Sequence, residues 1–140
     1  MPRTNKAAGP QAREKRLEVI RVRGVRVVVV DYSHCSREGA WEITNQFDKW
    51  IRAQKPNSVN VLFDVNKPYY EPAHVNHWKK SLGRYDTYIR KSCFINASPF
   101  FNMLLPALRS FAAIVGVPMK KERGLFFKDK EAALQWLSEP

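Results

Sequence analysis

The stretch VVVVDYSHCS, residues 27–36, gathers side chains from which enzymes build catalytic sites. Ser33 and Cys35 are nucleophiles, His34 is a base, and Asp31 could orient that base. However, neighbouring side chains of an extended strand point to opposite faces, so Ser33 and His34 cannot easily form an attacking pair. No G-x-S-x-G pattern is present either. We therefore interpret the stretch as a strand end followed by turn and capping residues, and expect neither catalytic residues nor enzymatic activity.

Histidines and cysteines are the other candidates for chemistry. His74 and His77 are three residues apart on a predicted helix, a spacing that can bring two imidazoles together, and His34 lies elsewhere. Two ligands do not make a metal site, so we interpret the histidines as solvated and expect no metal and no cofactor. Cys35 and Cys93 are too few for a disulfide framework and lack metal-ligand spacing, which favours a reducing cytoplasm.

The sequence predicts alternating strands and helices, which would position these residues. Segments rich in β-branched and apolar residues are predicted as strands: 17–23, 25–32, 58–65, 92–97 and 124–129. Apolar residues at helical spacing predict helices after Ser36, near Pro72, after Ser98 and after Asp129. The order β-β-α-β-α-β-α-β-α predicts a single-domain α/β sandwich with a mostly parallel central sheet flanked by helices.

The longest apolar stretch, residues 100–117, is interpreted as a buried helix. It contains Asn102, Pro106 and Arg109 and is shorter than the roughly 20 apolar residues of a membrane span. Pro106 should kink this helix. Its apolar side is predicted to consist of Phe100, Leu104, Leu108, Phe111 and Val115.

Three segments resemble the STAS-like family, small α/β domains related to bacterial anti-sigma-factor antagonists. They are VLFDVNKPYYEPAHVNHWKK, YIRKSCFINA and GLFFKDKEAALQWL, and the similarity covers residues 17–138. The closing signature of the family is matched by Phe127, Asp129, Ala133, Trp136 and Leu137, with one residue inserted after Phe127.

The resemblance implies a non-catalytic binding or regulatory module for a partner protein or a small polar or lipidic ligand. Some members of the wider superfamily are switched by phosphorylation of a serine at a helix start. Here the corresponding stretch, DVNKPYYEPAH, contains no Ser or Thr, so the phospho-switch is expected to be absent. NASPFF stands where the family often has glycines after the fourth strand, which argues against a ligand cradled by the backbone there.

Polar residues follow the predicted parallel strands at their carboxyl ends, where ligands bind in open α/β sheets. Asp31 and Ser33 could lie at the rim of such a site. An anion or polar head group could be received by the following side chains, with the two tyrosines as apolar walls: Asp64, Asn66, Lys67, Tyr69, Tyr70, Asn96 and Ser98. The competing interpretation is that the polar ones satisfy local backbone amides as turn and cap residues.

The formal net charge of +11 leaves a second class of function open. Residues 1–26 carry 8 Lys and Arg against 2 Glu, and residues 1–16 are interpreted as a flexible basic leader before a domain at 17–138. The N-terminus lacks the apolar core of a secretory signal, in keeping with a cytoplasmic protein.

Further basic residues lie around the second predicted helix, where they are interleaved with Trp78 and Tyr85: Lys79, Lys80, Arg84, Arg90 and Lys91. We expect a solvated basic face, because both aromatic residues fall on the apolar stripe of the helix. The alternative function is a nucleic-acid or anionic-membrane-surface binder that uses the N-terminal arm and this helix. The sequence leaves open whether the protein forms homo-oligomers.

Overall fold

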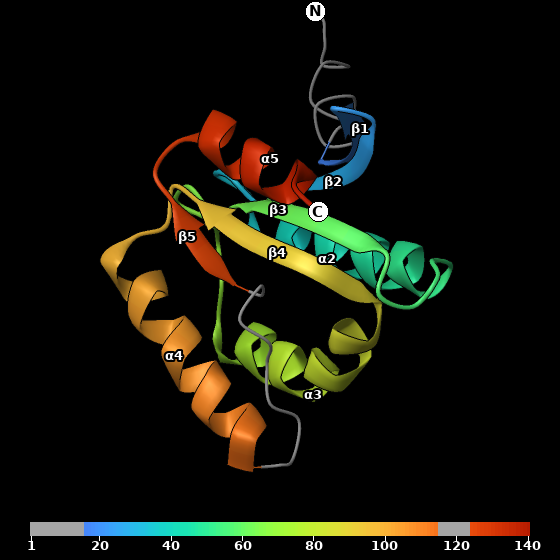
Figure 1. Cartoon of the computed structure of the whole chain (residues 1–140). Helices are drawn as coiled ribbons and strands as arrows, with labels where there is room; N and C mark the ends of the chain where they lie inside the picture. Colours follow the sequence, from blue (N-terminus) through green and yellow to red (C-terminus); the bar gives the residue numbers. More distant parts are fainter. Residues whose placement is uncertain (1–15, 115–123) are drawn as a thin grey trace, which may run out of the picture.

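The computed structural model describes residues 16–114 and 124–140, so the predicted leader, except Arg16, lies outside the described residues. The sheet has the strand order β1-β2-β3-β4-β5 (Figure 1). Its first two strands are antiparallel and the remaining pairs are parallel. The strands are β1 (Leu17–Val22), β2 (Val25–Asp31), β3 (Val59–Asp64), β4 (Ile89–Ile95) and β5 (Leu125–Phe127). The predicted α/β fold with a mostly parallel sheet is therefore confirmed.

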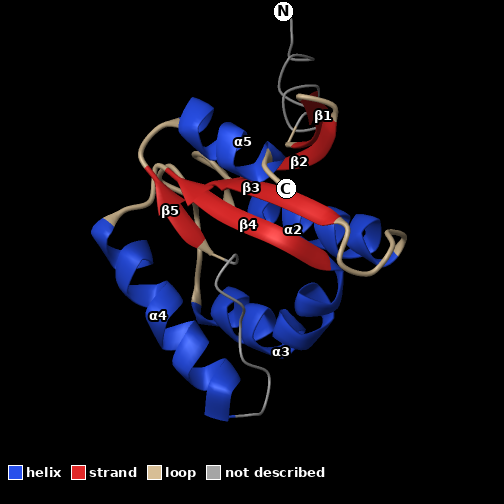
Figure 2. Ribbon diagram, in the orientation of Figure 1, coloured by secondary structure: helices blue, strands red, loops and turns tan. Residues whose placement is uncertain are grey.

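Helices cover both faces of this sheet (Figure 2). They are α2 (Arg37–Arg52), α3 (Pro72–Tyr88), α4 (Pro99–Ile114) and α5 (Lys130–Ser138). α5 packs against β2, β3 and β4 on one face, while α2 and α3 pack on the other. α4 lies beside α3 and makes its main described contacts with it. The second face is thus covered by a helix pair plus a peripheral helix.

Local signals place the starts of three helices and the first turn as predicted. The side chains of Ser36, Ser98 and Asp129 each accept a hydrogen bond from a first-turn amide of α2, α4 and α5, at 3.0, 3.3 and 3.2 Å. Between β1 and β2, Arg23 and Gly24 have φ angles of 54° and 80°. Two successive positive φ angles match the right-handed twist of a two-residue hairpin, which explains the glycine.

The fourth strand begins earlier than predicted, at Ile89 rather than at residue 92. Arg90 and Lys91 lie in this strand, and as charged residues they were not predicted to belong to it. Both side chains donate hydrogen bonds to carbonyl oxygens at the carboxyl end of α5. Lys91 is buried, and its Nζ donates to the carbonyl oxygens of Trp136 and Glu139 at 2.8 and 2.9 Å. Arg90 donates to Glu139 at 3.1 Å as well. The prediction of a solvated basic face is therefore wrong for Lys91, because a helix carboxyl end attracts a cation.

The inner side of α4 also differs from the prediction. Phe100 is half exposed, and Phe101 is buried in its place. The sequence could not distinguish them, because apolar residues surround this helix on every side and any stripe fits the pattern.

Candidate functional site

The stretch 27–36 forms a turn at the end of β2. The backbone amide of Ser33 donates to Asp31 Oδ1 at 2.8 Å, and His34 follows with a φ of 50°. Cys35 is buried, accepts a hydrogen bond from the amide of Tyr69 at 3.4 Å, and has its pKa raised by that burial. A thiol with a raised pKa stays protonated and is a poor nucleophile. The residues thus act as turn and packing residues.

The polar residues at the other strand ends are brought together at this edge of the sheet. Asp64 Oδ1 accepts from the amide of Asn66 at 3.2 Å and from Asn96 Nδ2 at 3.1 Å. Asn66 Nδ2 lies 3.3 Å from His34 Nε2. Lys67 and Asn96 have φ angles of 49° and 61°, as in tight turns. These contacts fit the turn interpretation, and binding of an anion or head group here stays a prediction.

The remaining three residues of the predicted site, Ser98, Tyr70 and Tyr69, each have a different role in the structure. Ser98 caps α4. Tyr70 stacks on Phe100 with ring centroids 5.2 Å apart. Tyr69 lines a cavity on the α3 and α4 side of the sheet. Of the residues predicted from the sequence as ligand-binding, Tyr69 alone lines this cavity.

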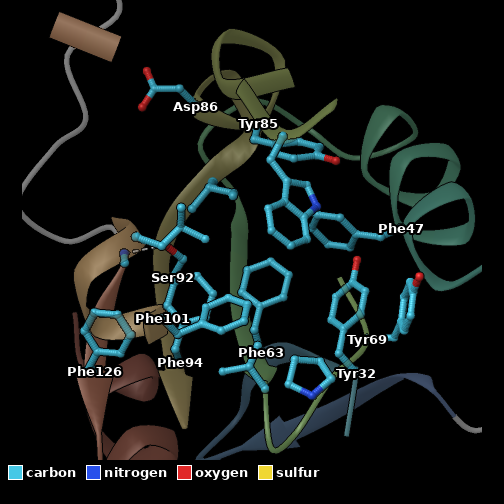
Figure 3. A pocket seen from close by; sticks show the side chains of 16 residues that line it. Tyr32, Phe47, Phe63, Tyr69, Tyr85, Asp86, Ser92, Phe94, Phe101 and Phe126 are labelled. Atoms are coloured by element: carbon cyan, nitrogen blue, oxygen red, sulfur yellow. Dashed lines mark hydrogen bonds between the residues drawn. The ribbon is translucent and has the colours of Figure 1, made fainter. Parts of the chain in front are cut away.

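The floor of the cavity is a row of phenylalanines across three parallel strands (Figure 3). Phe63 on β3, Phe94 on β4 and Phe126 on β5 are in register with one another. Their rings stack at centroid distances of 5.2 and 5.5 Å. All three side chains are only partly buried. Aromatic rings on the inner face of a sheet normally lie under a helix, so a partly buried row marks incomplete filling above it.

Helices α3 and α4 supply the opposite wall. Trp78 and Tyr85 contribute from α3, and Phe101 and Leu104 contribute from α4. The space between wall and floor is about 130 Å³. Because Trp78 and Tyr85 face it, neither aromatic belongs to the basic outer face of α3.

The cavity is mostly apolar, although tyrosines and the carboxylate residue Asp86 line it. Tyr32 OH lies 2.7 Å from Thr44 Oγ1, and Tyr85 OH donates to Asp48. Both hydroxyls are therefore paired with residues of α2, and burial raises the pKa of each phenol. The tyrosines present carbon surface to the cavity. Ser92, whose Oγ accepts from the amide of Gly124 at 2.8 Å, is a polar residue at its edge.

Both histidines of α3 contact other side chains, which corrects the expectation that they are solvated. His74 is buried and stacks on Trp41 with centroids 4.0 Å apart. His77 Nε2 lies 2.8 Å from Asp48 Oδ2 and 3.5 Å from Ser81 Oγ. A catalytic triad needs the acid and the hydroxyl on opposite imidazole nitrogens. Here both contact the same nitrogen, so this cluster lacks triad geometry.

Neither a metal-ion cluster nor a membrane-spanning helix is found in the described part of the chain. Within residues 16–114 and 124–140, no three His, Cys, Asp or Glu side chains gather where they could hold a metal ion. In the same part of the chain, no helix has the length and apolar character needed to cross a membrane.

Comparison with known proteins bears on the fold. No protein-family model and no curated protein matches the sequence. A solved structure, that of an uncharacterized protein of the DUF3478 family from Shewanella loihica PV-4, has a SpoIIAA-like fold and superposes on this chain with a TM-score of 0.58. The similarity covers 86% of this chain and 91% of the Shewanella protein at 16% identity. The fold of this chain is SpoIIAA-like. The fold that the STAS-like resemblance implied is thereby confirmed.

On this SpoIIAA-like scaffold, the phenylalanine row is the feature that sequence reasoning missed. In the structure, Phe63, Phe94 and Phe126 are each the last but one residue of β3, β4 and β5. The predicted strands end two or three residues beyond each phenylalanine, so the predicted ends do not bring the three rings into line. The unfilled space above them depends on where α4 lies, which the aligned strands do not reveal.

Proposed function

We propose that the protein is a non-catalytic binding module whose ligand is a small apolar molecule, or the apolar end of a larger one. The ligand would occupy the cavity between the phenylalanine row and helices α3 and α4. The observation that carries the proposal is the partly buried row of Phe63, Phe94 and Phe126 under an unfilled space. Unfilled apolar space weakens a fold, and a ligand that fills it regains the lost contacts.

The dimensions of the cavity suit a ring or a short hydrocarbon segment. Its volume of about 130 Å³ is close to that of an apolar cavity of roughly 150 Å³ that stays dry and binds benzene. The aromatic lining favours flat or hydrocarbon groups through stacking and edge contacts. A carboxylate or phosphate inside would lose its hydration without a cationic partner among the described lining residues, so a charged group would have to remain at the opening.

A regulatory role fits this proposal in one respect. A ligand that touches α3, α4 and the sheet at once would stabilise α4 against α3 and so fix the surface around that helix. The SpoIIAA-like fold is compatible with such a module. A partner protein could then bind the surface around α4 in the ligand-bound state and not in the ligand-free state.

The test is calorimetric titration of the full chain with indole and with octanol, using glycerol as a polar control. We expect indole and octanol to bind and glycerol not to bind. Leu104 lines the cavity, whereas its neighbour Met103 lies on the outside of the same helix. Leu104→Trp should fill the space and weaken indole binding at least tenfold, while Met103→Trp should leave it unchanged.

Two results would contradict the proposal. One is that neither apolar compound binds to the folded chain. The other is that Leu104→Trp and Met103→Trp bind indole equally well, which would place the compound somewhere else. Melting temperatures of both variants would show that they fold.

A further inference from the structure

The exposed side of α4 carries a stripe that is mostly apolar. Phe100, Met103 and Ile114 are 50%, 74% and 82% exposed. Ala107 and Ser110 between them are exposed too. The spacing of three and four residues places these five side chains on one stripe of the helix, here called the outer stripe. It contains no charged residue.

Helix α2 shows what an ordinary outer face looks like in this protein. Its exposed positions are occupied by polar and charged side chains such as Glu42, Gln46 and Lys49. α4 instead has Phe101 and Leu104 against the protein and the outer stripe on its exposed side, where Tyr70 stacks on Phe100 at one end. A helix that is apolar on both sides is covered on both sides in its working state.

Charge indicates what covers the outer stripe. From Thr87 to Lys121 the sequence contains no Asp or Glu. Arg109 lies within α4. Lys80 and Arg84 are exposed on α3, the helix against which α4 packs. The covering surface should therefore be negatively charged.

A second copy of the chain does not meet that requirement, because it would bring the same basic residues and a net charge of +11 to the interface. An anionic bilayer does meet it, since it offers negative headgroups above an apolar interior. Amphipathic segments with apolar residues beside basic ones lie in this interface with the apolar side buried.

The length of α4 also fits a helix that lies on a membrane. It spans Pro99–Ile114, includes Pro106 and Arg109, and is not long enough to cross a bilayer. We propose that α4 docks on anionic membranes, with the outer stripe among the headgroups and acyl-chain ends.

This docking surface differs from the surface considered from the sequence, which was the N-terminal arm together with the helix at 72–88. It also stands apart from the ligand proposal, because the outer stripe and the cavity lining share no residue. Failure of one proposal leaves the other intact.

The experiment is cosedimentation of the full chain with vesicles of phosphatidylcholine containing 30% phosphatidylglycerol, and with vesicles of phosphatidylcholine alone. We expect binding to the anionic vesicles and at least tenfold weaker binding to the neutral ones. The double variant Met103→Ser/Ile114→Ser should lose at least tenfold in affinity for anionic vesicles. Val19→Ser, which removes a 43% exposed apolar residue from β1, should bind like the wild type.

Three outcomes would overturn the proposal. The first is absence of binding to anionic vesicles. The second is unchanged binding of the double variant, which would mean that basic segments bind the vesicles without the outer stripe. The third, read by light scattering, is a wild-type dimer that the double variant converts to a monomer while vesicles remain unbound, because a second copy would then cover α4. Unchanged circular dichroism would show that both variants fold.

Discussion

On the α5 side of the sheet, Leu62, Cys93 and Leu137 have no exposed surface. On the α3 and α4 side, the rings of Phe63 and Phe94 remain partly accessible above the same strands. Alternate residues of one strand therefore experience two environments, a closed face and an open face. The open face is confined to the region under α3 and α4, because under α2 the same side of the sheet is closed by buried residues such as Phe47, Ile51 and Val61.

Side-chain size and helix position explain this difference. Ala133 on α5 is fully buried, and its small side chain lets that helix approach the sheet closely. α4 makes its main described contacts with α3 rather than with the strands. Large rings on the floor line the cavity that lies between the sheet and these helices in the described part of the chain.

The largest expected loss of stability comes from truncating a leucine on the closed face. Leu137→Ala would create a new cavity under α5, and we expect it to lower the free energy of unfolding by about 2–5 kcal/mol. Leu104 is only partly buried and already lines a cavity, so Leu104→Ala should cost less than Leu137→Ala. Urea unfolding of both variants measures the contrast. Equal losses would mean that the open face is as tightly packed as the closed one.

A smaller loss of stability is expected from a change at the carboxyl end of α5. Lys91 Nζ donates to two carbonyl oxygens at the end of α5 and lies over the ring of Trp136, 4.8 Å from its centroid. Lys91→Met keeps the aliphatic stem but removes two hydrogen bonds from a charged donor, while the carbonyls of Trp136 and Glu139 keep the amide of Glu139 and the guanidinium of Arg90. The loss of the charged donor should cost about 1.5–3 kcal/mol. The matched control is Lys80→Met on the exposed side of α3, expected to change stability by less than about 0.5 kcal/mol. If the two variants unfold at the same urea concentration, Lys91 does not anchor α5.

The same two faces show what the sequence can and cannot predict. Caps such as Ser36 and Asp129 were predictable because they depend on neighbours in the chain. The role of Lys91 was not, because its partners at Trp136 and Glu139 are distant in sequence and a lysine in a strand resembles a surface residue. The strand-end residue Asp64 was correctly expected near Asn66 and Asn96, since parallel strands end at one edge.

The cavity was beyond prediction for a different reason. Phe63 and Phe94 look like ordinary core residues, and the strand pattern is the same whether or not a helix fills the space above them. Choosing Phe101 over Phe100 for the inner side of α4 likewise requires knowing where that helix lies. Packing between elements, rather than patterns within them, determines the open face.

The smallest expected effect concerns a buried imidazole on the open face. His74 is 1% exposed, and its Nδ1 accepts a hydrogen bond from the amide of Glu71 at 3.2 Å. The proton therefore lies on Nε2, which has no hydrogen-bond partner within the described residues. Burial lowers the pKa of His74; nearby Glu71 acts in the opposite direction, while His77 and Arg37 lower it further.

The sign of the pH dependence follows from this lowered pKa. As pH falls below the usual histidine pKa of about 6.5, the unfolded chain takes up a proton that the folded chain resists, so the free energy of unfolding falls. His74→Gln keeps a side-chain acceptor for the amide of Glu71 but cannot titrate. The urea midpoint should therefore drop less between pH 7.5 and 5.5 in the variant than in the wild type. If both drop equally, the folded chain accepts the imidazolium at His74, and water must reach that side of α3.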